Sequence, residues 1–354
     1  MQRILIFIFP ASPFAVERPV YVALVPAAGT RPPLYILLRL SSAPLHKPLL
    51  VTGAHRTGTG WVSRVLAKSP TPLCYIWEPF SPRHRPGTLP IGFERYFQYV
   101  CADNLGDFPQ LASALTDTIA LRYRPLAELR SLRSPRDAGR MVRDWWIFSS
   151  ERRRRAAALL KDPIALFSSE WLADTFDLDV VVLIRHPAAF VASLKTRDWR
   201  HSFQSLLDQP LLMRDFLHPY EEEMRYHAVK GRDIVDESAV LWKVLYSAVE
   251  RFQEERADWI FVRLEDLSRN TVPAFRELYD GLELEWDDKV ESFLHSTSSA
   301  RNLVVDSDPG SVKRNSAAHS WSWKKQLTPE EIERVRAITD PLWRRFYSDA
   351  DWGD

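Results

Sequence analysis

The stretch 52–61, Thr-Gly-Ala-His-Arg-Thr-Gly-Thr-Gly-Trp, combines three glycines with three threonines and one arginine. Glycines let a backbone approach an anion closely, and the unpaired N–H groups at a helix start attract negative charge. A short apolar run, 49–52, precedes the loop, and apolar residues at helical spacing follow it, at positions 61, 62, 65 and 66. Strand, glycine loop and helix in this order predict a cradle for a phosphate or sulfate group.

This loop lacks two parts of a nucleotide-hydrolysing P-loop, in which lysine and then serine or threonine follow the second glycine. Gly53 and Gly58 have the required spacing, but Thr59 and Gly60 occupy the lysine and hydroxyl positions, and the cation stands earlier, at Arg56. We therefore expect the loop to hold an anion without hydrolysing a magnesium nucleotide. An ordinary glycine-rich strand–helix turn is the alternative.

The same residues resemble the 5′-phosphosulfate loop of sulfotransferases that use 3′-phosphoadenosine 5′-phosphosulfate (PAPS). That pattern is Thr-Gly-x-x-Arg/Lys-Ser-Gly-Thr-Thr/Ser, followed by an aromatic or aliphatic residue. The resemblance places Arg56 at the transferring group. It departs at Gly60, where the family usually has a hydroxyl, so one side-chain contact to the 5′-phosphate is missing. The donor-binding residues that it implies in this loop are Gly53, His55, Arg56, Thr57, Gly58, Thr59, Gly60 and Trp61.

A second motif, Ile-Arg-His-Pro-Ala-Ala-Phe-Val-Ala-Ser at 184–193, follows the strongest apolar run of the chain, 180–184. It resembles the 3′-phosphate site of the same family, in which a serine lies eight residues after the arginine. Arg185 and Ser193 match, and an arginine with a hydroxyl can hold a phosphate by charge-assisted hydrogen bonds. Alone, the motif fits a surface arginine and a helix-face serine equally well. Its order and separation from the first loop favour a shared donor site.

Sulfuryl transfer to a hydroxyl requires a general base and stabilisation of charge on the leaving group. Glu78 in Trp-Glu-Pro-Phe, at the exit of a predicted strand, resembles the proposed glutamate base of carbohydrate sulfotransferases, and His84 is the second candidate. Lys161 in Lys-Asp-Pro resembles a Lys-x-Pro element near the bridging oxygen. A structural carboxylate and a surface lysine are the plain alternatives. Catalytic roles are therefore predicted for Glu78, Arg56 and Lys161.

A basic, aromatic stretch near the C-terminus, 313–325, resembles the loop that closes over the nucleotide in cytosolic members of the family. Lys313 and Arg314 are the predicted donor contacts there, although Asn315 replaces the expected glycine. A solvated basic loop fits these residues equally well. The arginine run 152–155 is typical of a solvated helix face, with acceptor binding as the alternative.

Apolar runs that predict strands alternate with segments that predict helices. This alternation predicts an α/β protein with a central parallel sheet, and the resemblance implies a three-layer, P-loop NTPase-like sulfotransferase fold. The strands are expected at 49–52, 73–77, 180–184 and 259–264. The helices are expected at 91–130, 137–158, 166–176, 237–255, 273–282 and 287–296, with others beginning at Pro187 and after Thr328.

The 354 residues show no internal repeat and no clear linker. We expect a catalytic domain at 48–350, with a lid or acceptor-side insertion at 199–232. Residues 1–47 are expected to be a poorly ordered extension, either with two short strands or arising from an overlong gene start. A net charge of +1 does not suggest a nucleic-acid partner, and two cysteines give no zinc framework, so no metal is expected. No run of 18 apolar residues predicts a membrane span, and cytoplasm is the default compartment.

The function predicted from these motifs is transfer of a sulfuryl group from PAPS to a hydroxyl, more plausibly of a saccharide or glycolipid than of a phenol or steroid. A P-loop kinase or NTPase is the second hypothesis, and a magnesium requirement would favour it. A non-catalytic nucleotide-binding protein on the same fold is the third. The acceptor and the oligomeric state are left open by the sequence.

Overall fold

The computed structural model describes residues 3–8, 20–25, 44–229, 231–298 and 321–353. The chain forms two compact units, Met1–Leu45 and His46–Asp354. Within the first unit, β1 (Arg3–Ile8) and β2 (Val20–Val25) pair as an antiparallel hairpin. The motifs singled out above all belong to the second unit.

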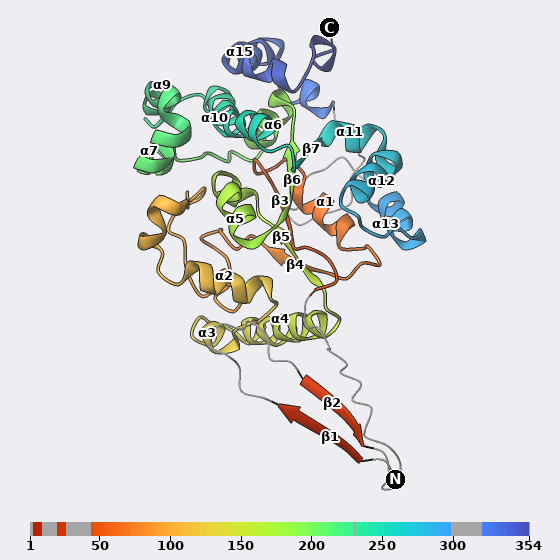
Figure 1. Cartoon of the computed structure of the whole chain (residues 1–354). Coiled ribbons are helices and arrows are strands. Elements are labelled where there is room, and N and C mark those ends of the chain that lie inside the picture. The colour runs from red at the N-terminus through yellow and green to blue at the C-terminus, as the bar shows by residue number, and fades with distance from the viewer. Residues whose placement is uncertain (1–2, 9–19, 26–43, 230, 299–320, 354) are drawn as a thin grey trace. The chain divides into compact units, whose positions relative to one another are not determined.

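The second unit contains a five-stranded parallel sheet, which confirms the predicted fold class (Figure 1). The strand order is β4-β5-β3-β6-β7, so the chain leaves β3 toward one edge of the sheet and later returns to its other side. Ligands of such sheets bind at the carboxyl ends of the strands beside this reversal. The strands are β3 (Leu49–Gly53), β4 (Leu73–Trp77), β5 (Ala157–Lys161), β6 (Asp179–Ile184) and β7 (Ile260–Arg263).

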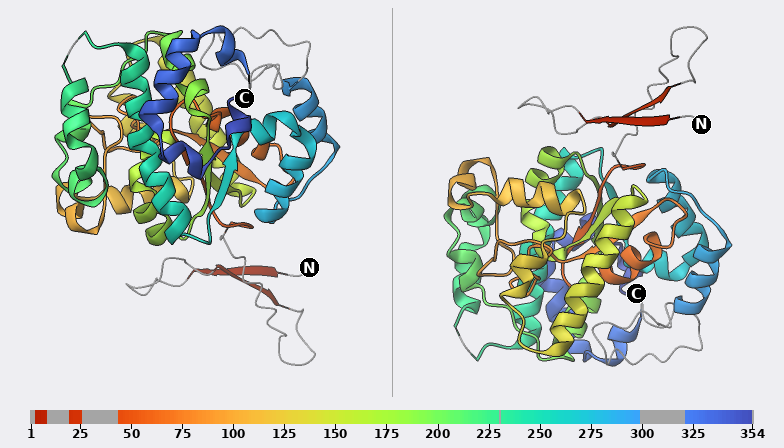
Figure 2. Two further views of the ribbon diagram at one scale, coloured as in Figure 1. Left: turned by 90° about the horizontal axis from the view of Figure 1, so that it is seen from above. Right: turned by 90° about the horizontal axis from the view of Figure 1, so that it is seen from below.

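Helices cover both faces of the sheet, which gives the expected three layers (Figures 1 and 2). Alternate strand residues enter two separate apolar clusters, and β3 and β6 are therefore mostly apolar along their length rather than alternating. One cluster is completed by α1 (Thr59–Leu66), α11 (Leu264–Arg269), α12 (Thr271–Gly281) and α13 (Asp288–Ser298). The other includes α2 (Leu111–Ile119), α4 (Pro135–Arg153), α5 (Ser169–Phe176), α6 (Pro187–Lys195), α10 (Ile234–Glu255) and α15 (Pro329–Thr339).

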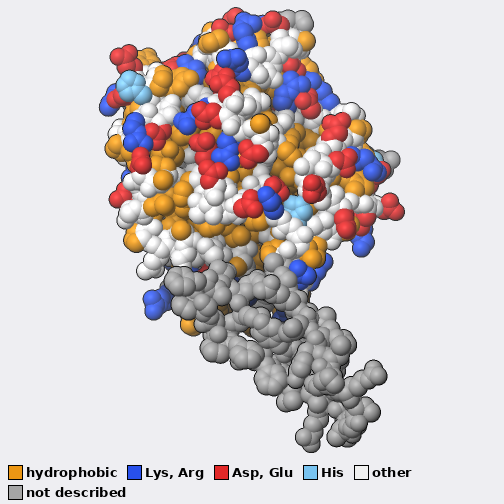
Figure 3. Space-filling view, viewed as in Figure 1, with side chains coloured by type: hydrophobic (Ala, Val, Ile, Leu, Met, Phe, Trp, Pro, Cys, Tyr) orange, Lys and Arg blue, Asp and Glu red, His pale blue; other side chains and the backbone are white. Residues whose placement is uncertain are grey.

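Short helices make up most of the remaining regular structure, and α15 begins at the predicted N-cap, Thr328, which forms a capping box with Glu331. The segment 199–232, predicted to be a lid or insertion, contains five of these short helices within its described part, 199–229. The short helices are η1 (Ala102–Asp107), α3 (Pro125–Leu129), η2 (Pro163–Ser168), α7 (Gln204–Leu207), α8 (Pro210–Leu212), η3 (Met213–Leu217), η4 (His218–Tyr220), α9 (Glu221–His227), η5 (Ser322–Lys325), η6 (Leu342–Arg345) and η7 (Asp349–Asp351). On the face shown in Figure 3, acidic and basic side chains are interspersed.

The predicted helix over 91–130 is wrong in its first part, because residues 91–100 form an irregular loop. Phe97 has a φ of 57°, which a right-handed helix does not allow. The aromatic residues at helical spacing pack into the core instead, and Phe93 stacks on Phe80 with ring centroids 4.6 Å apart. The backbone N–H of Val100 donates to Ser168 Oγ rather than to a helical carbonyl. Tertiary packing thus overrides the local pattern here.

The predicted helix over 137–158 is wrong at its end, because α4 stops at Arg153 and residues 157–161 form β5. Arg155, with a φ of 59°, turns the chain out of the helix. The short apolar run that follows pairs with β4 on one side and β3 on the other. Because pairing on both sides satisfies its backbone groups, this run is a central strand, and Lys161 stands at a strand end.

Candidate active site

The loop between β3 and α1 has backbone angles that only glycine adopts easily at two positions. Gly53 has a φ of 132°, and a Cβ there would lie 2.4 Å from the backbone oxygen of Leu183 in β6. Gly58 has a φ of 87° and is the N-cap of α1, with no side-chain hydrogen bond at the cap. The start of α1 therefore presents backbone N–H groups that no capping side chain satisfies, as an anion site requires.

The two motifs predicted from sequence meet at the carboxyl ends of β3 and β6. The Arg185 guanidinium donates to the backbone oxygen of Arg56 at 2.5 Å, and Arg56 Nε donates to Ser193 Oγ at 3.2 Å. β3 and β6 pair directly, with Gly53 opposite Leu183, so the loops after them are neighbours. Two guanidinium groups and a hydroxyl are thus brought together next to the loop that leads into α1, and such a combination can hold a multiply charged anion.

Arg185 is held by α10 on both of its backbone groups. Its N–H donates to Tyr246 Oη at 2.7 Å, and its carbonyl accepts a hydrogen bond of 2.9 Å from Trp242 Nε1. The two aromatic rings stack on each other at 4.2 Å. Arg185 is itself only 4% exposed. Since both backbone groups are bonded, the direction of its side chain is determined by the core.

Glu78 and Lys161 form an ion pair at the ends of the neighbouring strands β4 and β5. Trp77 and Lys161 are partners in the strand register, and the backbone N–H of Glu78 donates to the Lys161 oxygen at 2.9 Å. The Glu78 side chain is 14% exposed and the Lys161 side chain is 10% exposed. A Cβ on Gly60 would lie 3.9 Å from Lys161 Cε. The lysine therefore lies between the carboxylate and the first turn of α1.

Asp162 is a residue of this site that the sequence analysis did not single out. Its buried carboxylate accepts hydrogen bonds from the backbone N–H groups of Phe80 at 2.7 Å, Ile164 at 3.0 Å and Ala165 at 3.2 Å. Burial and then the Glu78 carboxylate raise the pKa of Asp162 to about 7, while the Phe80 N–H opposes this shift. The carboxylate ties the Glu-Pro-Phe loop to β5. An aspartate before proline is a helix-cap pattern, which is the signal that could have revealed it.

The sequence matches the profile of the sulfotransferase family over residues 48–288, which covers the loop, the Glu78–Lys161 pair and Arg185. The chain belongs to this family. Sulfuryl transfer is the activity for which the family is named.

Similarity to individual sulfotransferases is weaker than the family match. The chain is 28% identical over 83 residues to carbohydrate sulfotransferase 1 from Danio rerio, a match that spans 23% of this chain and 20% of the relative. The sulfotransferase domain of the Synechococcus PCC 7002 olefin synthase is 16% identical, with a TM-score of 0.43. This match covers 87% of this chain and 96% of that domain. Mouse sulfotransferase SULT7A1, solved with PAP, is 13% identical, with a TM-score of 0.39 and 88% of each chain covered.

Two of the residues predicted to bind the donor have side chains in the core of the sulfotransferase. His55 lies among Phe97, Phe190 and Trp199, with ring centroids 5.3 to 5.7 Å away, and burial lowers its pKa to about 3. Trp61 packs against Phe275 and is 3% exposed. These side chains support the loop from beneath, and only their backbone groups are candidates for donor contact.

The threonines of the loop are buried as well. Thr57 Oγ1 donates to the Ala54 oxygen at 2.6 Å, within the loop, and Thr59 is 3% exposed at the start of α1. The Thr57 hydroxyl therefore shapes the cradle from inside.

His84, the second candidate base, has both ring nitrogens beside carbonyl oxygens. Nδ1 lies 2.6 Å from the Ser81 oxygen and Nε2 lies 2.8 Å from the Leu89 oxygen. A carbonyl accepts but does not donate, so neither nitrogen presents a lone pair to an acceptor hydroxyl in this arrangement. The geometry makes His84 a structural link within the 81–90 loop.

Lys313 and Arg314 lie outside the described residues. The Trp-Lys part of the same motif is described, and Trp323 stacks on the buried His186 with centroids 5.2 Å apart. The ammonium of Lys324 lies 5.5 Å from the Trp323 ring. The end of the predicted closing loop is therefore next to the residue that follows Arg185.

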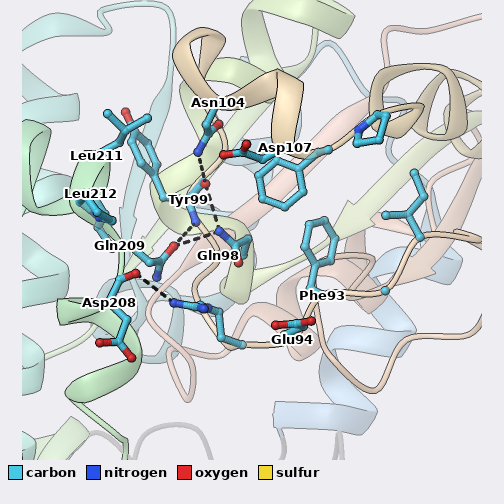
Figure 4. Close-up of a pocket in the computed structure, with 16 residues that line it drawn as sticks. Phe93, Glu94, Gln98, Tyr99, Asn104, Asp107, Asp208, Gln209, Leu211 and Leu212 are labelled. Carbon is cyan, nitrogen blue, oxygen red and sulfur yellow. Dashed lines mark hydrogen bonds between the residues drawn. The ribbon is translucent and has the colours of Figure 1, made fainter.

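A cavity of about 640 Å³ lies between the 91–109 segment and the start of α8 (Figure 4). Phe93, Phe108 and Leu212 are among its apolar lining residues. A hydrogen-bonded network forms another part of the wall, in which Gln209 Oε1 accepts from the Tyr99 N–H at 2.8 Å and from Gln98 Nε2 at 3.1 Å. The carboxylates that line the cavity belong to Glu94, Asp107 and Asp208, and the one basic side chain among the lining residues is that of Arg95.

This cavity is linked to both halves of the site by single contacts. Phe93 stacks on Phe80, which follows Glu78 by two residues, and Gln209 donates to the Phe97 oxygen at 3.2 Å. Phe97 in turn packs against His55 of the phosphate loop. The cavity wall therefore shares packing contacts with the segments that carry Glu78 and His55.

Over the parts of the chain that the structure covers, no three His, Cys, Asp or Glu side chains gather as a metal site would require. Within the same residues, no helix has both the length and the apolar content needed to cross a membrane.

Proposed function

We propose that this sulfotransferase moves the sulfuryl group of PAPS onto a hydroxyl of a saccharide or glycolipid acceptor. The observation that carries the proposal is the contact between the two motifs, Arg185 to Arg56 and Arg56 to Ser193. PAPS carries a phosphosulfate on the 5′ carbon and a phosphate on the 3′ carbon of its ribose, and each of the two motifs supplies an arginine. The Gly53–Gly58 loop and Arg56 would take the 5′-phosphosulfate, and Arg185 with Ser193 the 3′-phosphate.

In the proposed reaction the acceptor oxygen attacks sulfur, the new O–S bond forms, and the bond from sulfur to the 5′-phosphate oxygen breaks. The acceptor proton passes to Glu78, and 3′-phosphoadenosine 5′-phosphate (PAP) leaves. Arg56 would stabilise charge on the sulfuryl oxygens, and Lys161 charge on the bridging oxygen. The position of Lys161 between Glu78 and Gly60 supports this division of roles.

Glu78 is the better candidate for the base. Its carboxylate lies beside Lys161, whereas both ring nitrogens of His84 face carbonyl oxygens. Glu78 also has a φ of 38°, a conformation that a non-glycine residue adopts at an energetic cost. Its backbone is held there by hydrogen bonds to Lys161 and Ser81, which keep the side chain at the carboxyl ends of the strands.

The cavity beside the site is proposed to receive part of the acceptor. Its carboxylates can accept hydrogen bonds from sugar hydroxyls, and the partly exposed Phe108 offers an apolar face on which a sugar ring can pack. Glu94→Gln and Phe108→Ala are expected to raise the acceptor KM at least about fivefold and to leave PAP binding unchanged. A saccharide screen with both variants tests this assignment, and equal effects on acceptor and donor would contradict it.

The deciding experiment is calorimetric titration of the full chain with PAP, with and without magnesium. Micromolar binding that does not depend on magnesium, and that weakens at least about tenfold in Arg56→Ala and in Arg185→Ala, is the expected result. Arg276→Ala serves as the matched control, because this exposed arginine lies on α12 and pairs with Glu291 of α13.

Two outcomes would contradict the proposal. Binding of Mg-ATP in place of PAP would favour a P-loop kinase or NTPase. Tight PAP binding without turnover of any hydroxyl acceptor offered with PAPS would favour a non-catalytic nucleotide-binding protein.

A further inference from the structure

Exposed apolar side chains concentrate on α3 and α4. Of the ten large apolar side chains that are exposed in the described chain, five belong to these two helices. Trp146 is 62% exposed and Leu126 is 78% exposed, and Leu129, Val142 and Trp145 are the other three. Val142, Trp145 and Trp146 are three and four residues apart, so they share one face of α4. A cluster of this kind marks an interaction surface.

The same region is strongly basic. Residues 121–155 contain eleven arginines and four acidic residues, a net charge of +7 in a chain whose total is +1. Several of these arginines are paired, as Arg140 is with Asp137 and Arg154 with Glu151. Arg152 and Arg153 make no ion pair with any other described residue and are exposed. The excess positive charge is therefore available to an external anion.

A cavity of about 510 Å³ joins the apolar and basic features. It lies between residues 121–123 and the last turns of α4, and three arginines are among its lining residues: Arg152, Arg153 and Arg122, the last of which pairs with Asp117. Trp145 and Ser149 of α4 also line this cavity. Guanidinium groups and hydroxyls, such as that of Ser149, are donors that proteins use to bind phosphate. Trp145 belongs both to this cavity and to the exposed apolar cluster.

We propose that the α3–α4 face docks the sulfotransferase on the surface of an anionic phospholipid membrane. Trp145, Trp146 and Leu126 would enter the interface between headgroups and acyl chains, where tryptophan is favoured. Arg152 and Arg153 would bind a lipid phosphate and be attracted by the negative surface. A second copy of the chain is a poorer occupant, because two faces of the same positive charge repel each other. The inference does not depend on the identity of donor or acceptor.

The test is co-sedimentation of the full chain with vesicles of phosphatidylcholine alone or with about 30 mol% phosphatidylserine. Binding is expected only to the anionic vesicles, and it should weaken as salt is raised from 0.1 to 0.5 M. Trp146→Ala/Arg153→Glu is expected to lower the partition coefficient about tenfold or more. The matched control is Tyr226→Ala/Arg225→Glu, which makes the same kinds of change at an exposed aromatic residue and an exposed arginine of α9.

Thermal unfolding of both double variants shows that the fold is retained. The proposal is overturned if the wild-type chain does not bind anionic vesicles or if the two double variants lose binding equally. It is also overturned if light scattering shows that the wild-type chain is a dimer and that only the α4 double variant is a monomer. Binding to a DNA duplex without binding to vesicles would overturn it as well. Inorganic phosphate should release the chain from the vesicles only at ionic strengths at which any other salt does the same. That result supports docking on lipid rather than capture of a free ion.

Discussion

Lys161 connects two elements from the end of β5, because its ammonium pairs with Glu78 and its Cε lies beside Gly60. Its ammonium also lies 5.9 Å from the centre of the exposed Trp77 ring. A side chain in this position can interact both with the proposed donor cradle and with the proposed base. The chemistry of the site can therefore be tested by changes at single residues.

Glu78→Gln is expected to lower kcat by a factor of roughly 100 to 10,000, because the amide cannot accept the acceptor proton. The affinity for PAP should be unchanged within about twofold, since the glutamate is not expected to contact the nucleotide. Steady-state kinetics and calorimetry measure the two effects. Glu277→Gln, at an exposed position of α12, is the control. A loss of kcat below tenfold would assign Glu78 a structural role.

Gly60→Ser is expected to strengthen PAP binding, because it restores the hydroxyl that the family pattern has at this position. The substitution fits the backbone, since the added Cβ meets only Lys161 Cε at 3.9 Å, an ordinary contact distance. Replacing a helical glycine should also raise the free energy of unfolding by roughly 0.5 kcal/mol. Calorimetric titration of Gly60→Ser and Gly60→Ala with PAP separates the two effects. Equal PAP affinity in both variants would show that the serine hydroxyl does not contact the nucleotide.

At the scale of elements, the β3–α1 unit depends on the close approach of β3 to β6. The added Cβ at Gly53 would contact the Leu183 backbone, which cannot rotate away. At Gly58 it would meet the Leu264 side chain at 2.6 Å, which can move, although the φ of 87° still disfavours alanine. The loop is thus shaped by the strand beside it as much as by its own glycines.

Gly53→Ala is expected to lower the free energy of unfolding by roughly 2 kcal/mol or more, because it combines a positive φ with a backbone clash. Gly139→Ala is the matched control within α4, where nothing lies within 4 Å of the added Cβ, and it should stabilise the protein by roughly 1 kcal/mol. Urea unfolding of both variants measures these changes. Equal stabilities would show that the approach of β3 to β6 can relax without loss.

At the scale of the whole molecule, buried histidines make the fold sensitive to acid. Burial lowers the pKa of His55 and of His186 to about 3, from an ordinary value near 6.5. The unfolded chain therefore binds protons below pH 6.5 that the native state does not bind, and stability falls as pH drops from 6.5 toward 3. Asp162 acts in the opposite sense, since its raised pKa makes stability fall as pH rises from about 4 to 7.

His186→Phe is expected to reduce the slope of stability against pH between 6.5 and 4 by up to about 1.4 kcal/mol per pH unit, which is the effect of one proton. Phenylalanine can keep the stacking on Trp323 without titrating. Urea unfolding at several pH values measures the slope. His218→Phe, at an exposed histidine, should leave the slope unchanged. If the two variants behaved alike, burial of His186 would not be the source of the acid sensitivity.

The sequence alone determined the features that depend on short stretches of chain. Glycine spacing after an apolar run predicted the β3–α1 loop, and the apolar runs predicted four of the five strands of the parallel sheet. Local patterns also predicted the N-cap of α15 and the start of α6, because these follow from residues that are neighbours along the chain. The family resemblance belongs to this level as well, since it rests on two short motifs.

Only the tertiary structure decided which of these pieces meet. β5 is a strand because two neighbours pair with it, and that register brings Lys161 to Glu78, 83 residues away. Arg56 reaches Ser193, 137 residues away, because β3 and β6 are adjacent. Core packing likewise directed His55 and Trp61 inward and turned 91–100 into an irregular loop. Contacts between distant residues depend on strand order and on competition for buried space, and neither is encoded in a local pattern.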